Sequence, residues 1–251
     1  MTENWKFAVV GGLGGAALAV VLVVILAWTG ALPMSRGASD ARIRDYLLRN
    51  PSILVDMTNK MQADQEAQDD AARQAALDKI GLKRFFDPKV AFVTGPADAK
   101  TTVVEFFDYN CPYCRASLPA VQKFYDAHKN DTRFAFIEFP IKGQNSTIAA
   151  HVAIAARKQP DKYLKFYFAL MGEEDLATPD LVFEVARKAG LDVEKLKSDM
   201  MDKSVDQAIK AAHDLAVASK IDGTPAFIVN GRIREGAIND TILNELARHK
   251  S

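Results

Sequence analysis

The chain has few of the residues that build metal sites and disulfide frameworks. Only two cysteines, Cys111 and Cys114, and four histidines occur among its 251 residues. Cysteines three positions apart exclude a scaffold held by several disulfides, and a closed zinc site would need about four ligands. Lysine plus arginine equal aspartate plus glutamate at 32 each, so no charge excess favours nucleic acid. We therefore predict no metal, no cofactor and no nucleic-acid partner.

Charged side chains are also absent between Lys6 and Arg36, where aliphatic residues dominate. The apolar run in this segment reaches the ~20 residues that a membrane helix needs. A signal peptide has a shorter core of ~7–15 residues and a small-residue cleavage site, which the following sequence matches poorly. We predict a short tail over 1–6 and an uncleaved transmembrane anchor over 7–30. A cleaved signal peptide and a buried soluble helix are the alternatives.

Residues 34–80 have a polar, alanine-rich sequence that is typical of a helical stalk. Pro51 lacks an amide hydrogen and disfavours helix in the preceding residue, so it separates two helices. Asn50 interrupts a short heptad seam of apolar residues spaced by threes and fours: Ile43, Leu47, Leu54, Met57 and Met61. We interpret 40–62 as a homo-oligomerisation segment. An amphipathic helix lying on its own globular domain is the alternative.

Residues 81–251 have the mixed pattern of an α/β domain. A β-branched and aromatic run over 101–107 predicts a strand, and 134–139 predicts another. Helical spacing over 112–128 completes a strand–helix–strand unit, whose strands should be parallel. The other predicted elements are a strand over 90–93, helices throughout 146–219, strands over 225–229 and 232–236 joined by a turn at Asn230-Gly231, and a helix over 240–249.

The two cysteines lie where a predicted strand is followed by a predicted helix. Pro112 suits the first helical position, which places Cys111 at the helix N-terminus. Free amides and the helix dipole stabilise a thiolate there, and such cysteines have pKa values lowered from ~8.5 to roughly 3.5–7.5. Cys114 lies one turn later, within disulfide reach. The Cys111-Pro112-Tyr113-Cys114 motif therefore predicts a pair that alternates between dithiol and disulfide.

Glu105 interrupts the first strand six residues before Cys111. A buried carboxyl group has a raised pKa and could exchange a proton with the Cys114 thiol. A glutamate facing solvent is the alternative, but apolar neighbours on both sides favour burial. Thr224-Pro225 opens a later strand, and the sequence alone does not decide whether its peptide bond is cis.

In this order, the motifs resemble the DsbA-like branch of the thioredoxin superfamily, from about residue 103 to the carboxyl end. The resemblance implies a thioredoxin-like fold with a helical insertion at about 146–219. It implies an exposed nucleophile at Cys111, a buried resolving thiol at Cys114 and a proton-transfer acid at Glu105.

The same resemblance implies that Thr224-Pro225 is a cis peptide that faces the disulfide and helps bind substrate backbone. Residues 43–51 are similar to the N-terminal region of suppressor-of-copper-sensitivity C and Com1-like proteins, several of which oligomerise. Tyr113 replaces the histidine of the dithiol oxidase, and Thr224 replaces its valine. Without that histidine the disulfide should be a weaker oxidant, so oxidation, isomerisation and reduction all stay open.

We therefore predict a membrane-anchored disulfide oxidoreductase or isomerase whose clients are exported proteins with thiols or disulfides. Disulfide chemistry favours a periplasmic or extracytoplasmic location and a membrane redox partner. Arginines after the apolar run favour the opposite orientation, although long domains translocate largely regardless of such charges. A protein that handles Cu(I) through the thiolate pair and a non-catalytic scaffold are the alternatives.

Overall fold

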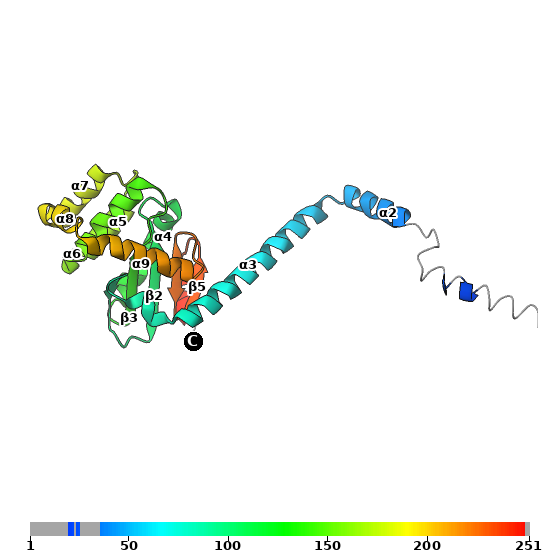
Figure 1. Ribbon diagram of the computed structural model, residues 1–251, viewed down its shortest axis with the longest axis horizontal. Helices are drawn as coiled ribbons and strands as arrows, with labels where there is room; N and C mark the ends of the chain where they lie inside the picture. Colours follow the sequence, from blue (N-terminus) through cyan, green and yellow to red (C-terminus); the bar gives the residue numbers. More distant parts are fainter. Residues whose placement is uncertain (1–19, 23, 26–35, 249–251) are drawn as a thin grey trace, which may run out of the picture. The chain divides into compact units, whose positions relative to one another are not determined.

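The computed structural model describes residues 20–22, 24–25 and 36–248 (Figure 1). Contacts divide the chain into one compact unit up to Gln65 and another from Glu66 onward. The anchor predicted over 7–30 lies outside the described residues except at 20–22 and 24–25. Within the described ranges, no helix is long and apolar enough to cross a membrane. The anchor therefore stays a prediction.

The first unit contains α2 (Arg36–Arg49) and the first part of α3 (Ser52–Ile80). The break between these helices falls at Asn50-Pro51, as predicted, and the Asn50 side-chain amide donates to the Tyr46 carbonyl at 2.8 Å. All five apolar residues of the heptad seam are exposed, from 42% at Leu47 to 70% at Leu54 and Met61. The seam thus leaves apolar surface uncovered within the chain.

The second unit is built on a five-stranded mixed sheet in the order β1-β3-β2-β4-β5. The central strands β2 and β3 are parallel, and the other pairs are antiparallel. The predicted parallel strand–helix–strand unit is confirmed, because α4 connects these two strands. The strands are β1 (Phe92–Thr94), β2 (Thr101–Phe107), β3 (Thr132–Glu138), β4 (Ala226–Val229) and β5 (Arg232–Glu235), and the connecting helix is α4 (Pro112–His128).

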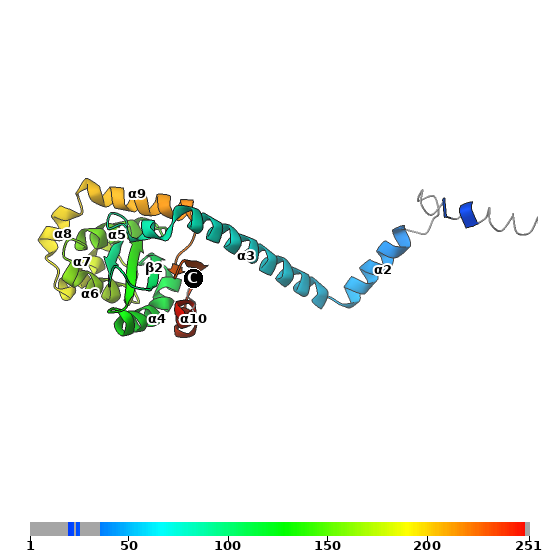
Figure 2. The same cartoon turned by 90° about the horizontal axis from the view of Figure 1, so that it is seen from below.

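Alternation along β2 divides the hydrophobic core into two layers, because successive side chains point to opposite faces. Val103 and Phe107 pack in the cluster that includes α4, α6 (Pro160–Met171) and α10 (Asp240–Arg248). Val104 and Phe106 pack in the cluster that includes the end of α3, the 3-10 helix η1 (Leu82–Phe86) and α9 (Lys203–Ala218). Figure 2 shows α9 and α4 on opposite sides of the sheet. Glu105 lies two positions from both Val103 and Phe107, so its side chain points to the same face of the sheet, which α4 and α6 cover.

The predicted helical insertion between β3 and β4 is confirmed, and local capping signals set the ends of α7 within it. Thr178 caps α7 by accepting from the Leu181 amide, and Gly190 ends the helix with a φ of 87°. A positive φ suits glycine because it has no Cβ. The insertion comprises α5 (Gln144–Ala156), α6, α7 (Pro179–Ala189), α8 (Val193–Asp199) and α9.

The end of α3, from Glu66 to Ile80, belongs to the second unit and packs within it. Leu77 is buried there, and Arg73 pairs with Glu235 at 2.7 Å. The stalk boundary predicted between residues 80 and 81 stays a prediction, although the compact unit itself begins at Glu66. Tertiary packing therefore extends into the carboxyl-terminal part of the segment predicted as the stalk.

Candidate active site

Cys111 lies where the sequence analysis places it, at the N-cap of α4. The chain leaves β2 at Phe107 and turns so that the Cys111 amide donates to the Asp108 carbonyl at 3.0 Å. Pro112 occupies the first turn of the helix, where its missing amide hydrogen costs nothing. The turn thus presents the Cys111 sulfur to the free amides of a helix start.

The two thiols have opposite proton affinities. A hydrogen bond from Cys114, opposed by burial, and further bonds from Thr224 and nearby backbone amides lower the pKa of Cys111 from 9.0 to about 5. Burial first, and then the hydrogen bond to Cys111, raises the pKa of Cys114 far above its ordinary value. Since the thiolate is the nucleophile, Cys111 is the attacking sulfur and Cys114 keeps its proton until a base removes it.

The expectation of an exposed Cys111 is wrong for this structure. Cys111 is 0% exposed and Cys114 is 1% exposed, and both are free thiols. The physical reason is that the Cys111 thiol turns inward and donates to the Thr224 carbonyl at 3.0 Å. Tyr113, between the two cysteines in sequence, is 64% exposed. A partner protein that approaches here meets Tyr113 before it meets sulfur.

The segment before β4 lies against the cysteine pair. The Thr224-Pro225 peptide bond is cis, as the resemblance implies. While Cys111 is a thiol that donates to the Thr224 carbonyl, as in this structure, the Thr224 hydroxyl is buried and has no hydrogen-bond partner among the described residues. It is therefore free to donate to the Cys111 sulfur once that sulfur is ionised. The role of this segment in binding substrate backbone stays a prediction.

Glu105 is buried, as predicted, with 2% of its surface exposed. It pairs with Phe136 of β3 on one side and Phe227 of β4 on the other. Burial raises its pKa from 4.5 to about 7, and a hydrogen bond from Tyr167 opposes that rise. After burial and the hydrogen bond to Cys111, the charge of Glu105 also raises the pKa of Cys114. A carboxyl group with this proton affinity suits proton transfer near neutral pH.

Asp108, which was not predicted as a functional residue, organises the loops around the cysteines. Its buried carboxylate accepts four hydrogen bonds of 2.7 to 2.8 Å, from the amides of Asn110, Ile141 and Lys142 and from the Ser146 hydroxyl. These donors join the turn before α4 to the loop after β3 and the start of α5. An aspartate two residues before asparagine in a turn was the available signal, but it did not specify the distant partners.

Arg115 was missed as well, and it fixes a further loop beside the same helix. Its guanidinium donates to the Tyr109 carbonyl at 3.0 Å, to the Glu174 carbonyl at 2.9 Å and to the Asp175 carbonyl at 2.7 Å. The Asn110 side chain accepts from the amide of Ala177, in the same loop, at 2.7 Å. The α6–α7 connection is thus held against the start of α4.

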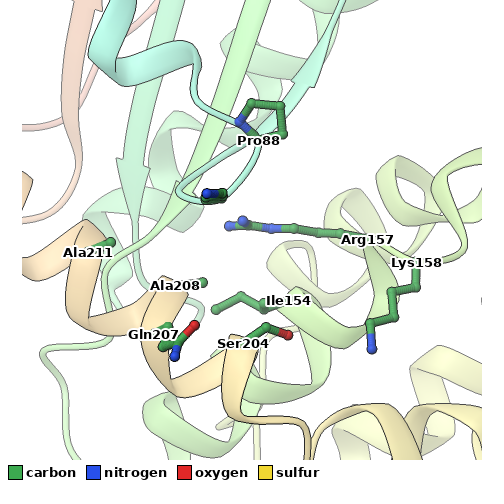
Figure 3. A pocket seen from close by; sticks show the side chains of 9 residues that line it. Pro88, Ile154, Arg157, Lys158, Ser204, Gln207, Ala208 and Ala211 are labelled. Carbon is green, nitrogen blue, oxygen red and sulfur yellow. The ribbon is translucent and has the colours of Figure 1, made fainter.

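A separate pocket of about 490 Å³ lies between the end of α5, α9 and the segment after η1 (Figure 3). Arg157 extends into it, but Arg157 already pairs with Glu138 and donates to the Val90 carbonyl. Lys158 also lines the pocket and bonds two aspartates at 3.2 Å. Two of the three cationic side chains that line the pocket, Arg157 and Lys158, therefore already have acidic partners, and no cysteine lines it.

Within the described part of the chain, no group of three or more histidine, cysteine or acidic side chains is placed to hold a metal ion. The candidate active site is therefore formed by the cysteine pair, Glu105 and Thr224, whose groups can exchange protons or electrons or donate to a thiolate.

A model of the DSBA-like thioredoxin domain matches residues 102–246, more than half of the chain. The chain belongs to this family. A second model, the copper resistance protein ScsC N-terminal domain, matches residues 40–68.

Curated relatives of this DSBA-like chain include proteins of two kinds. It is 30% identical over 162 residues to Na(+)/H(+) antiporter NhaA 3 of Salinispora tropica, over 64% of this chain and 24% of that protein. It is 30% identical over 171 residues to disulfide bond formation protein D of Bacillus subtilis, over 61% of this chain and 76% of that one. The chain thus spans about a quarter of the antiporter relatives and about three quarters of the Bacillus protein.

Solved structures similar to this chain include a thioredoxin-like oxidoreductase and ScsC. A thioredoxin-like oxidoreductase from Silicibacter pomeroyi shares 41% identity and a TM-score of 0.60, over 64% of this chain and 92% of that one. Proteus mirabilis ScsC in a transitional conformation shares 26% identity and a TM-score of 0.60, over 84% of this chain and 95% of that one. The similarity to ScsC thus extends beyond the DSBA-like domain.

Proposed function

We propose that this chain is a thiol–disulfide oxidoreductase that acts on thiols and disulfides of exported proteins through Cys111 and Cys114. The observation that carries the proposal is the opposite shift of the two thiol pKa values, to about 5 at Cys111 and upward at Cys114. One sulfur is ionised and ready to attack, and the other stays protonated until the second step. The naming of family relatives as disulfide bond formation proteins agrees with this chemistry.

The reductive direction has two balanced steps. The Cys111 thiolate attacks one sulfur of a client disulfide, forms a mixed disulfide and releases the other client sulfur as a thiolate. Glu105 then takes the proton of Cys114, and the new thiolate attacks the Cys111 sulfur, which breaks the mixed disulfide and releases the remaining client sulfur as a thiolate. The enzyme leaves as the disulfide, having given two electrons to the client. Oxidation of a client dithiol is the reverse sequence, and isomerisation stops at the mixed disulfide and returns.

The inward Cys111 thiol adds a requirement to this mechanism. When Cys111 is a thiol, a client must break its hydrogen bond to the Thr224 carbonyl before exchange can begin. When Cys111 is ionised, this hydrogen bond is already absent, because a thiolate has no proton to donate. Between about pH 5 and 7 we expect dithiobis(nitrobenzoate) to react with Cys111 faster than with a free cysteine side chain, because there the larger thiolate fraction outweighs the lower nucleophilicity of a thiolate with a low pKa. Reaction slower than that of unfolded protein at the same pH would contradict an accessible nucleophile.

Trapping of the mixed disulfide tests the whole proposal. The Cys114→Ala variant keeps the nucleophile but cannot resolve, so client adducts should accumulate on non-reducing gels. The matched control is Cys111→Ala, which should form none. Equal adducts in both variants, or none in either, would defeat the proposal. Scrambled ribonuclease refolding and the reduction potential, measured on one preparation, would decide between oxidation, isomerisation and reduction.

We also propose that the seam within 40–62 joins copies of this chain, because its apolar residues are exposed within the chain. Leu54→Lys should lower the molar mass measured by light scattering. Val55→Lys is the matched control, because Val55 is 59% exposed but lies outside the seam. An unchanged mass for both variants, or an equal fall for both, contradicts the seam as interface.

The anchor over 7–30, the periplasmic or extracytoplasmic location of the catalytic domain and a membrane redox partner belong to the same proposal. The 22-residue apolar stretch that motivates the anchor is long enough to span a membrane, so the protein should stay in the membrane fraction after carbonate extraction. Deletion of 7–30 should move it to the supernatant. Release of the full-length chain by carbonate would contradict the anchor.

Copper handling is the second candidate, and the match of residues 40–68 to a copper resistance protein domain favours it. Cu(I) would bind as cargo between two soft thiolates. Competition with bathocuproine should then give tight, stoichiometric binding that is lost in Cys111→Ser. If Cu(I) binds too weakly to compete with bathocuproine while disulfide exchange is normal, copper handling is not the main function.

A further inference from the structure

Helix α6 presents two tyrosines that each donate to a buried carboxyl group. The Tyr163 hydroxyl donates to Glu138 at the end of β3, and the Tyr167 hydroxyl donates to Glu105 in β2, both at 2.7 Å. Residues four apart lie on one face of a helix, so a single helix reaches both strands. All four side chains are at most 2% exposed. The helical insertion thus contacts the redox centre directly.

The two carboxyl groups differ in what balances their charge. Glu138 also pairs with Arg157, so its ionised form has a cation beside it. Glu105 forms no ion pair with any described residue, and the Tyr167 hydroxyl is the side-chain donor to it. A buried carboxylate without a cation depends strongly on each donor that it keeps.

Three titratable groups among the described residues feel the charge of Glu105: the Cys114 thiol in α4, the Tyr109 phenol in the turn after β2, and the Tyr167 phenol in α6, which also donates a hydrogen bond to it. Its paired residues on β3 and β4 are both phenylalanines. Burial holds the pKa values of both phenols well above the ordinary range, so neither ionises near neutral pH. Cys114 and Glu105 are therefore the pair between which a proton can move.

We propose that Tyr167 is a positioning residue that sets the pH at which Glu105 can take the proton of Cys114. Through this contact the helical insertion controls the resolving step of disulfide exchange. The inference rests on the proposed function and adds to it a residue that touches neither the client nor the reacting sulfurs. Its hydroxyl acts by holding the carboxylate in the form that accepts a proton.

Removal of the hydroxyl leaves the Glu105 carboxylate without that donor, so its pKa rises from about 7. In Tyr167→Phe, the pH midpoint of the Cys114-dependent step should move upward by about one unit. Attack by Cys111, isolated in a Cys114→Ala background, should keep its rate and pH dependence. The ring of Tyr167 packs edge-on against Phe107, and phenylalanine preserves this packing.

The matched control is Tyr163→Phe, which removes the same donor from the same helix but faces Glu138. Stopped-flow measurement of the resolving step on the full chain should show a shifted midpoint in Tyr167→Phe and an unshifted one in Tyr163→Phe. Equal shifts in both variants, or no shift in either, overturn the inference. Glu105→Gln should abolish the midpoint, and its persistence there would overturn the inference as well.

Carbon-13 NMR of the Glu105 carboxyl gives a readout that does not require activity. Its titration should move to higher pH in Tyr167→Phe and stay in place in Tyr163→Phe. Absence of a Cys114-dependent step in the wild-type protein would defeat the proposed function, whereas a normal step with an unmoved Glu105 titration defeats only the role of Tyr167. The two failures are therefore distinguishable.

Discussion

The sulfur of Cys111 lies 3.0 Å from the carbonyl oxygen of Thr224, which joins the start of α4 to the segment before β4. As a thiol, Cys111 donates to that carbonyl. As a thiolate it cannot, and the Thr224 hydroxyl, buried without a partner, is then the adjacent donor. One residue thus offers an acceptor to the protonated sulfur and a donor to the ionised sulfur.

Thr224→Val should raise the pKa of Cys111 above its value of about 5. Valine keeps the shape and the carbonyl but removes the hydroxyl that bonds the thiolate, so we expect a rise of about one unit. The ultraviolet absorbance of the thiolate, titrated on reduced protein, measures it. Thr224→Ser keeps a hydroxyl and should titrate close to wild type, so identical curves for serine and valine would contradict this role.

The stability of the reduced form relative to the oxidised form should rise with pH between about 5 and 9. In this window the native Cys111 is ionised while the unfolded cysteine keeps its proton, so the unfolded state binds more protons and the free energy of unfolding increases. Each pH unit contributes up to ~1.4 kcal/mol. The disulfide form lacks this contribution.

Glu105 has the opposite effect. Its native pKa is raised from 4.5 to about 7, so its contribution to stability is complete below pH 4.5 and is lost as pH rises through 7. The oxidised protein should therefore lose stability over this range, while in the reduced protein the Cys111 effect offsets the loss above pH 5. Urea unfolding of both forms across the pH range checks this, and parallel curves would contradict the assignment.

Asp108→Ala should lower the free energy of unfolding by roughly 3 kcal/mol, because it leaves several donors without their acceptor. The backbone amides of Ile141 and Lys142 and the Ser146 hydroxyl all depend on this carboxylate. Amide hydrogen exchange should speed up in the loop after β3. The control is Asp126→Ala, at an exposed site on α4, where we expect a change within about 0.5 kcal/mol.

Arg157→Met should destabilise the fold by roughly 3–5 kcal/mol, because it leaves the buried Glu138 carboxylate without its cation. The double variant Arg157→Met with Glu138→Gln should recover much of the loss, since no buried charge remains. The neighbouring Lys158→Met is the control: it breaks more exposed ion pairs with Asp199 and Asp202, so chemical denaturation should show ~1 kcal/mol or less. A loss in Lys158→Met as large as in Arg157→Met would contradict the distinction.

Local signals allowed much of the fold to be predicted. The strand over 101–107 and the helix over 112–128 occur at the predicted bounds. The turn at Asn230-Gly231 forms with positive φ at both residues, which their chemistry permits. In each case the signal is contained within a few residues, such as apolar periodicity, a cap or a turn dipeptide. The burial of Glu105 was also predicted, because its immediate neighbours are apolar.

Contacts between distant segments were not predictable in this way. Nothing near Asp108 in sequence indicates that its carboxylate accepts hydrogen bonds from the backbone amides at 141–142. The pairing of Tyr167 with Glu105 joins residues 62 positions apart. The inward orientation of the Cys111 thiol depends on where Thr224 lies, 113 positions away, and the prediction of an exposed sulfur was wrong for that reason.

The sequence by itself determined that a cysteine begins a helix beside a second cysteine, because proline, strand and helix signals act over short distances. Tertiary structure decided how strongly each sulfur and carboxyl group holds its proton. Those affinities depend on burial and on hydrogen bonds from Thr224 and Tyr167, which the fold brings in from the segment before β4 and from the helical insertion. Electrostatic environment is a property of the packed chain, whereas helix and strand periodicity are already present in the unfolded one.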